Sequence, residues 1–277
     1  MRVGIDLAQH QLGWDELVAR ARFAEELAFD GAWVFDHFKP LYGDPGGPCF
    51  EAYTLLGALA AATSRIRLGA LVTGVTYRHP SLLATEAVTV DHVSGGRLEL
   101  SLGAAWYGDE HRELGIPFPP TGERVERLEE ALLVVKALLT TDGATFDGRH
   151  YQLRDATYRP RPVQQPHPPI WVGAGGERRT IPVAARHADV WHSFGSLNAL
   201  RRKAQVLDDH ARRAGRDPAE ITRATHLSLS EPWATVRATA LGLMDAGFTY
   251  LVASWPREGR QRVEEFAERV LPELVGS

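Results

Sequence analysis

The sequence has a single cysteine, Cys49, and only three lysines beside 28 arginines. One cysteine excludes an internal disulfide and is typical of a protein in a reducing cytoplasm. No apolar run approaches the ~18 residues that a membrane-spanning helix needs, and the first residues enter a strand pattern without the features of a signal peptide. We therefore expect a cytoplasmic protein that does not bind membranes.

Several other classes of protein also lack support. The net charge of −4 over 277 residues provides no basic field for nucleic acid. The eleven histidines form neither a His-x-His pair nor a His-Glu-x-x-His motif, so no metal site is predicted. No Gly-x-Ser-x-Gly elbow is present. Lys136 and Lys203 fall in predicted helices, which disfavours a Schiff-base aldolase because only Lys39 follows a strand closely.

The sequence does contain a regular alternation of strand and helix patterns. Its strands are continuous apolar runs, as expected when both faces of a parallel sheet are covered. Eight strand–helix units in 277 residues predict one (β/α)8 TIM-type barrel domain over residues 1–277. The units are Arg2–Leu7 with Trp14–Phe29, Ala32–Asp36 with Glu51–Ala62, Ile66–Val72 with Pro80–Val93, Leu98–Leu102 with Glu123–Leu139, Ile170–Val172 with Arg178–Arg186, Ala188–Trp191 with Asn198–Ala214, Thr222–Leu229 with Thr235–Ala246, and Tyr250–Ser254 with Gln261–Leu274.

Two segments depart from the even spacing. Residues Tyr107–Gly122 are expected to form a loop, because three prolines there resist helix formation. Residues 142–169 are expected to form an insertion with a hairpin at Phe146–Tyr151, whose Asp-Gly pair matches a type I′ turn. Insertions that follow barrel strands lie over the mouth, where active sites are built. The insertion is therefore predicted to supply a wall of the substrate pocket.

A glycine-rich junction follows the fifth predicted strand, at Gly175 and Gly176. Glycine allows a ligand to approach the main-chain N–H groups closely, and the N-terminus of a helix favours an anion. Arg178 and Arg179 in the first helical turn oppose the helix dipole, which suggests an anion between them and the backbone. The junction is interpreted as a phosphate site; the alternative is an ordinary glycine turn with two solvated arginines.

The second predicted strand ends in Asp36-His37, which contains the best candidate for proton transfer. An imidazole has a pKa near neutrality, so His37 suits acid–base chemistry, although a structural histidine is the alternative. Asp36 would orient His37 or hold a ligand amide, or else serve as a cap or turn residue. His79 is expected in a helix-entry turn, and Glu110 and His111 are expected to be exposed to solvent.

A set of motifs spread over the whole chain resembles the bacterial luciferase-like flavin and deazaflavin oxidoreductase family. The motifs are Tyr77–Pro80, Ser94–Leu98, Leu102–Trp106, Glu110–Pro117, Arg124–Ala131, Arg159–Pro162, Pro168–Ile170, Gly175–Gly176 and Ala188–Trp191. Together they are far more specific than any one of them. The Asp-His-Phe and Gly-Gly-Glu-Arg-Arg segments resemble the members that use coenzyme F420, a deazaflavin, rather than FMN.

The resemblance implies a cofactor that extends from the glycine junction to His37. The phosphate would lie at the junction, the ring in front of a bulge that often contains a cis peptide bond, and His37 would be its catalytic proton partner. The implied cofactor contacts are Asp36, His37, Leu71, Val72, Thr73, Gly103, Ala104, Gly175, Gly176, Glu177, Arg178 and Arg179.

The resemblance also bears on the substrate. Trp106 stands where the sugar-phosphate dehydrogenase branch carries a catalytic glutamate. This departure disfavours glucose-6-phosphate, and an aromatic wall of Trp106 with Phe38 opposite favours a flatter or more hydrophobic substrate. The predicted activity is F420-dependent hydride transfer to or from a small organic substrate, in the reductase direction. The alternatives are an FMN-dependent monooxygenase and a non-redox phosphate-binding barrel. The family resemblance further implies a homodimer.

Overall fold

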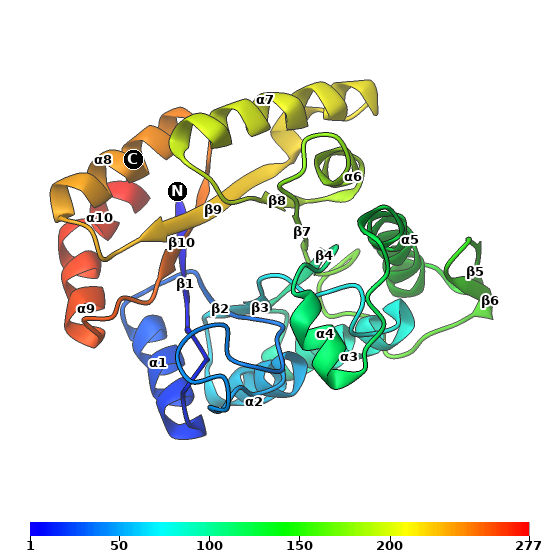
Figure 1. Cartoon of the computed structure of the whole chain (residues 1–277), viewed down its shortest axis with the longest axis horizontal. Coiled ribbons are helices and arrows are strands. Elements are labelled where there is room, and N and C mark those ends of the chain that lie inside the picture. Colours follow the sequence, from blue (N-terminus) through cyan, green and yellow to red (C-terminus); the bar gives the residue numbers. More distant parts are fainter. Residues whose placement is uncertain (277) are drawn as a thin grey trace.

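Eight parallel strands surround the centre of the molecule in the computed structural model, which describes residues 1–276 (Figure 1). They are β1 (Arg2–Asp6), β2 (Gly31–Val34), β3 (Arg67–Ala70), β4 (Leu98–Gly103), β7 (Ile170–Gly173), β8 (Val190–His192), β9 (Thr222–Ser228) and β10 (Tyr250–Ser254). Neighbouring strands pair in the order β1-β10-β9-β8-β7-β4-β3-β2, and β2 pairs with β1 to close the barrel. The (β/α)8 prediction is confirmed.

Helices cover the outside of this barrel (Figure 1). They are α1 (Trp14–Glu26), α2 (Ala52–Ala62), α3 (Pro80–Ser94), α4 (Gly108–Leu114), α5 (Thr121–Thr140), α6 (Thr180–His187), α7 (Leu197–Arg213), the 3-10 turn η1 (Pro218–Glu220), α8 (Trp233–Asp245), α9 (Arg260–Arg269) and α10 (Leu271–Val275). Within residues 1–276, no helix combines the length and the apolar character needed to cross a membrane.

Helix α4 lies in the segment that was expected to be a loop, so that prediction is wrong. The prolines that motivated the prediction all follow the helix, and Gly115 ends it in a left-handed conformation with φ 67°. Helix α1 ends three residues before its predicted limit, because Ala28 has a φ of 60°.

The amino-terminal half of the barrel is filled by aromatic rings. Trp33 and Trp171 have ring centroids 4.3 Å apart, and Tyr250 packs edge-on against both. Gly4 and Gly69 make room for them, since a Cβ atom at either position would lie within 2.6 Å of the Trp33 ring. The rings close this end of the barrel, so ligands are left to the carboxyl ends of the strands.

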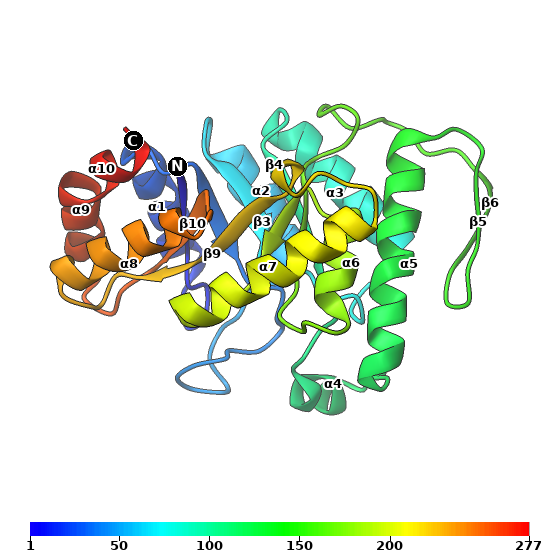
Figure 2. The ribbon, with the colours of Figure 1, turned by 90° about the horizontal axis from the view of Figure 1, so that it is seen from above.

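The insertion forms the expected hairpin, from β5 (Ala144–Asp147) and antiparallel β6 (Gln152–Ala156). It runs along the outside of α5, where Glu130 accepts backbone hydrogen bonds from three turn residues (Figure 2). Four residues separate the paired Asp147 and Gln152, and Gly148 does not have a positive φ, so the predicted type I′ turn is wrong. The insertion follows a helix rather than a strand, which directs it away from the mouth.

Candidate active site

The carboxyl ends of the strands enclose a pocket of about 470 Å³, a volume typical of small-molecule sites. Its lining residues are Phe35, Asp36, His37, Leu41, Tyr42, Leu71, Val72, Gly74, Tyr77, Gly103, Ala104, Ala105, Trp106, Gly173, Ala174, Gly175, His192, Ser193, Phe194 and Lys203. None of residues 142–169 contributes, so the prediction that the insertion forms a pocket wall is wrong.

The pocket brings together eight of the predicted site residues: Asp36, His37, Leu71, Val72, Gly103, Ala104, Trp106 and Gly175. Six others lie outside its lining: Phe38, Thr73, Gly176, Glu177, Arg178 and Arg179. Phe38 packs edge-on against Tyr77, with ring centroids 4.9 Å apart, instead of facing Trp106 across the pocket. The structure therefore gives no support to the substrate contact predicted for Phe38.

His37 is held by a buried carboxylate from α4. Its Nδ1 lies 3.0 Å from Oε2 of Glu110, which is 1% exposed. Glu110 also accepts hydrogen bonds from the backbone N–H groups of Phe38 (2.7 Å) and Lys39 (2.9 Å) and from the hydroxyl of Tyr77. The expectation that Glu110 is exposed is wrong: these four donors draw its side chain inward.

The donors around Glu110 determine its charge. Burial alone would raise the pKa of Glu110, but hydrogen bonds from His37 and Tyr77 outweigh burial and leave the pKa below its usual value. An ionised carboxylate only accepts hydrogen bonds, so Nδ1 of His37 carries a hydrogen and Nε2 has the lone pair. A neutral His37 can accept a proton at Nε2, and its imidazolium form is stabilised by Glu110 and can return it.

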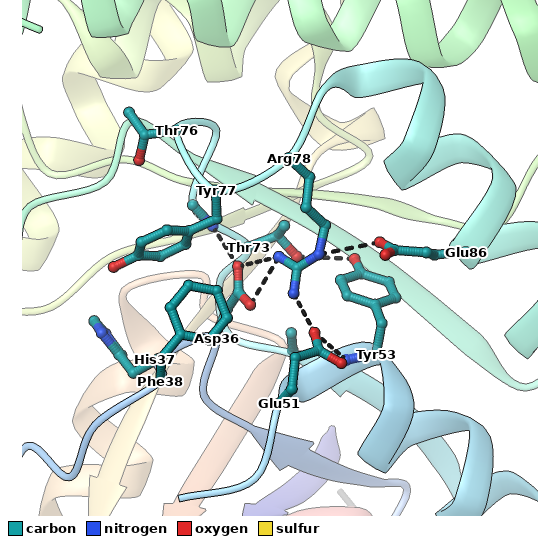
Figure 3. Close-up of polar contacts among 12 residues, drawn as sticks. Asp36, His37, Phe38, Glu51, Tyr53, Thr73, Thr76, Tyr77, Arg78 and Glu86 are labelled. Carbon is teal, nitrogen blue, oxygen red and sulfur yellow. Dashed lines mark hydrogen bonds and ion pairs between the residues drawn. The ribbon is translucent and has the colours of Figure 1, made fainter. Parts of the chain in front are cut away.

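The carboxylate of Asp36 points toward Arg78 (Figure 3). The orientation of His37 is set by Glu110 instead. Both carboxylate oxygens of Asp36 accept hydrogen bonds from Nη1 of Arg78, at 2.8 and 2.9 Å, and Oδ2 also accepts one from the N–H of Gly74, at 2.9 Å. Burial raises the pKa of Asp36 although Arg78 opposes that effect. Asp36 thus positions the segment after β3.

The same guanidinium ties two helices, α2 and α3, to the pocket. Arg78 pairs with Glu51, the N-cap of α2, and with Glu86 of α3 at 3.1 Å, and it lies over the ring of Tyr53 (Figure 3). The Tyr53 hydroxyl bonds to Oγ1 of Thr73 at 2.9 Å. This interaction explains why Thr73 is turned away from the pocket.

The segment after β3 forms the pocket floor. The peptide bond between Leu71 and Val72 is cis, as the resemblance implied. A Cβ atom at Gly103 or at Gly173 would lie 2.6 Å from Cγ2 of Val72, so both neighbouring strands need glycine there. Glycine at these two positions lets Val72 pack closely against the ends of β4 and β7.

The glycine junction between β7 and α6 has free backbone donors. The N–H of Gly176 is used within the turn, since it donates to Oγ1 of Thr180 at 2.9 Å. Within residues 1–276, the N–H groups of Gly175, Glu177 and Arg178 have no protein acceptor. Because Gly176 is already bonded, Gly175 is the glycine that the junction offers to a ligand in the pocket.

Lys203 of α7 is the cation beside this junction, and sequence reasoning set it aside as a helix residue. Its Nζ donates to the carbonyl of Phe194 at 2.7 Å and to Oγ of Ser193 at 3.2 Å. A Cβ atom at Gly175 would lie 3.6 Å from this ammonium group. Burial lowers the pKa of Lys203, and no carboxylate in the described part of the chain forms an ion pair with it. Such a cation favours an anionic ligand.

Of two other histidines, His79 has the predicted position at a helix start, whereas His111 is not exposed as predicted. His79 caps α3, where Nδ1 accepts a hydrogen bond from the N–H of Ser81 at 3.2 Å, so the helix-entry prediction is confirmed. His111 is fully buried, bonds to Oγ1 of Thr76 at 2.6 Å and stacks on Tyr77, so its predicted exposure is wrong. The family motifs at Tyr77–Pro80 and Glu110–Pro117 were the only sequence signal for these contacts.

The fold and pocket define a class of protein, the (β/α)8 barrels with a small-molecule pocket at the carboxyl ends of their strands. Within that class, residues 1–267 match the family described as luciferase-like monooxygenase, and the chain belongs to this family.

The relatives that the chain is similar to are named for two kinds of cofactor, F420 and FMNH(2). The chain is 31% identical over 236 residues to an F420-dependent glucose-6-phosphate dehydrogenase of Microbacterium testaceum, covering 83% of the chain and 68% of the relative. It is 32% identical over 208 residues to an FMNH(2)-dependent dimethylsulfone monooxygenase of Pseudomonas putida, covering 74% of the chain and 56% of the relative. The chain thus spans little more than half of the second relative.

The fold also matches solved structures over nearly its whole length. The coenzyme F420 dependent tetrahydromethanopterin reductase of Methanopyrus kandleri superposes with a TM-score of 0.85, covering 99% of each chain at 19% identity. At that identity the likeness establishes the barrel and its helices.

Proposed function

We propose that this protein is a coenzyme F420-dependent oxidoreductase that transfers a hydride between the deazaflavin and a small organic substrate, in the reductase direction. One observation carries the proposal: the pocket has an anion-binding junction with Lys203 beside it, and a carboxylate-bound imidazole, His37, in its wall. The F420-dependent relative and the F420-dependent structural neighbour support the deazaflavin.

The junction fits the phosphate of such a cofactor. The N–H groups of Gly175, Glu177 and Arg178 lack protein acceptors, and Lys203 adds a positive charge without a carboxylate partner within residues 1–276. Amides and a half-buried ammonium are the donors that a phosphate anion takes up. When bound, a deazaflavin supplies a ring carbon that gives or accepts a hydride.

We propose that His37 transfers the proton that accompanies the hydride. In the reductase direction the imidazolium form of His37 releases a proton from Nε2 to the substrate atom that becomes a hydroxyl or amine. Glu110 stabilises the charged ring before the transfer and keeps Nδ1 protonated after it. The carboxylate therefore acts by positioning His37 and does not contact the substrate.

The substrate side of the pocket is apolar and aromatic. Trp106 is 66% exposed at the rim and stacks on Tyr107, and Leu41, Tyr42 and Phe194 also line the pocket. We propose that this wall selects a flat, hydrophobic substrate, because aromatic faces bind such groups better than they bind sugar phosphates.

Cofactor titration followed by ring fluorescence tests the proposal. Wild-type protein is expected to bind F420 with micromolar affinity and more tightly than FMN. Lys203→Met should weaken F420 binding by tenfold or more, about 1.4 kcal/mol, because it removes a charge-assisted contact. Lys203→Arg should restore part of the affinity.

Lys136→Met is the matched control for Lys203→Met. Lys136 is also half-buried on a helix, donates to a backbone carbonyl (His187, 2.7 Å) and has a pKa lowered by burial, but it lies outside the pocket. Its replacement should leave F420 affinity unchanged. Tight binding of FMN with none of F420 would favour the monooxygenase alternative, and binding of neither would favour the non-redox barrel.

We also propose a homodimer in the cytoplasm. Exposed apolar side chains on α3, Leu82 at 51% and Val93 at 48%, supply a surface that a second copy can cover. The single cysteine supports a reducing compartment. Sedimentation of the purified protein tests the homodimer, and fractionation of the native cells tests the cytoplasmic location.

A further inference from the structure

A second carboxylate–imidazole arrangement lies inside the barrel beneath the pocket, on the β1, β8 and β9 side. Nε2 of His192 is 3.0 Å from Nδ1 of His226, and Nε2 of His226 is 3.7 Å from Oδ2 of Asp6. His192 and Asp6 are buried, and His192 lines the pocket. The proton-transfer role proposed for His37 uses none of these groups.

This arrangement is shielded from water, which keeps both imidazoles neutral. The ring of Phe194 stacks on His226 at 4.7 Å and meets His192 edge-on at 4.8 Å. Burial lowers the pKa of His226 to about 4 and lowers that of His192 well below its usual value. Two neutral imidazoles in contact share a single hydrogen bond, so one ring donates and the other accepts.

The direction of that hydrogen bond follows from Asp6. Burial raises the pKa of Asp6 to about 6, so the carboxylate is ionised at neutral pH and attracts the N–H of His226 at Nε2. Nδ1 of His226 then accepts, Nε2 of His192 donates, and Nδ1 of His192 keeps a lone pair. Within residues 1–276 that lone pair has no hydrogen-bond donor.

The position of His192 indicates which ligand group it meets. Its backbone carbonyl accepts a hydrogen bond from the N–H of Ala174 at 2.9 Å, which places it directly beside Gly175 at the anion junction. The next residue, Ser193, accepts a hydrogen bond from Lys203 at 3.2 Å. In a ligand whose phosphate lies at this junction, the segment next to the phosphate therefore lies beside His192.

We propose that Nδ1 of His192 accepts a hydrogen bond from a hydroxyl group of the polyol chain that joins the cofactor ring to its phosphate. His226 and Asp6 hold His192 in the tautomer that this hydrogen bond requires. The inference rests on the proposed function only in its need for a ribityl phosphate, which F420 and FMN share.

The tautomer is tested without any activity measurement. Long-range proton–nitrogen NMR of the histidine rings in the cofactor-free protein at pH 7.5 should show His192 protonated at Nε2 and unprotonated at Nδ1. Addition of F420 should shift the Nδ1 resonance of His192 as its lone pair becomes hydrogen-bonded. A proton on Nδ1, an imidazolium, or an unchanged Nδ1 resonance at saturating F420 overturns the proposal.

A pair of substitutions at the same position separates the ligand contact from the structural one. The amide of His192→Asn reaches the place of Nδ1 and supplies a carbonyl acceptor there, whereas the amide of His192→Gln reaches the place of Nε2 and keeps only the contact with His226. His192→Gln should weaken F420 binding about tenfold, roughly one hydrogen bond, and His192→Asn should stay within about threefold of wild type. Equal affinity of the two variants overturns the proposal.

FMN serves as the second probe because it carries the same ribityl phosphate. Wild-type protein that binds FMN and not F420 contradicts the proposed function, and the comparison of His192→Asn with His192→Gln is then made with FMN. A preserved melting temperature in both variants shows that they fold. Should the melting temperature of His192→Gln fall, the NMR shift of wild-type Nδ1 on titration still decides the proposal.

Discussion

Two buried carboxylates lie next to imidazoles in and beneath the pocket, yet their pKa values shift in opposite directions. Glu110 is 1% exposed and receives four hydrogen bonds, and its pKa lies below the usual value. Asp6 is 5% exposed, its contact with the N–H of Trp255 is long at 3.4 Å, and burial raises its pKa to about 6. Burial outweighs the hydrogen bonds at Asp6, whereas the hydrogen bonds outweigh burial at Glu110.

This difference decides what each imidazole can do. His37, next to a firmly ionised carboxylate, is able to carry a positive charge during proton transfer. His192 and His226 lie in a dry site with a weakly solvated carboxylate, and burial lowers the pKa of both rings. They are suited to directed hydrogen bonding without a change of charge.

The largest effect is expected on the His37 wall. His37→Phe removes the proton donor, so single-turnover oxidation of reduced F420 by an accepted substrate should slow by roughly 10²- to 10⁴-fold. F420 affinity should change by less than about threefold, since the phosphate contacts remain. An undiminished rate would show that the proton comes from elsewhere and would remove the functional contrast between the walls.

Next in size is the stability of the Glu110 site. Glu110→Gln replaces an acceptor of four hydrogen bonds by a group that also donates, and should cost about 1–3 kcal/mol of unfolding free energy at pH 7.5. Because the folded pKa of Glu110 is lowered, its stabilisation is present above the usual glutamate pKa and is lost as pH falls through the folded value. Urea unfolding measures the difference in free energy of unfolding between wild type and Glu110→Gln. This difference should be smaller at acid pH than at pH 7.5, and an equal difference at the two pH values would contradict the prediction.

The opposite sign is expected at Asp6. A carboxyl whose pKa is raised from 3.8 to about 6 destabilises the folded state progressively as pH rises across that range. Asp6→Asn should therefore increase the free energy of unfolding at pH 8 by about 1–3 kcal/mol and have little effect at pH 4. A variant less stable than wild type at pH 8 would show that the charge of Asp6 is better compensated than its surroundings indicate.

The smallest effect is expected at the rim of the pocket, away from both Glu110 and Asp6. Trp106 is 66% exposed and meets His37 edge-on at 5.8 Å. Trp106→Ala should raise KM for an aromatic substrate about 3- to 10-fold, the equivalent of one aromatic contact, with little change in kcat. Steady-state kinetics on aromatic and aliphatic substrates measures the change in KM. An equal increase in KM for both kinds of substrate would count against an aromatic wall.

The barrel was predictable because its strand and helix patterns are local. Uninterrupted apolar runs such as Tyr250-Leu-Val-Ala253 of β10, whose four residues are all buried, indicate covered strands whatever lies beside them. The exceptions were also local in origin: α4 was missed because prolines after a helix were counted against it, and the insertion was misplaced because it follows α5 rather than a strand.

The site was predictable only in part. A histidine at a strand end and glycines before a helix point to the mouth of the barrel, and Gly175 and His37 do line the pocket. Lys203 gave no such signal, because a lysine on a helix reaches the pocket only when its face is known. Gly176 resembled a ligand site equally well, but its N–H is taken by Thr180.

By itself the sequence determined the eight-fold alternation, the closed apolar barrel and the placement of His37 and Gly175 at strand ends, since period and strand order follow from neighbouring residues. Only the tertiary structure decided that Glu110 binds His37 from 73 positions away and that Asp6 stands behind His226. The pKa of a carboxylate depends on its burial and on the donors that surround it, and barrel closure brings both about from distant parts of the chain.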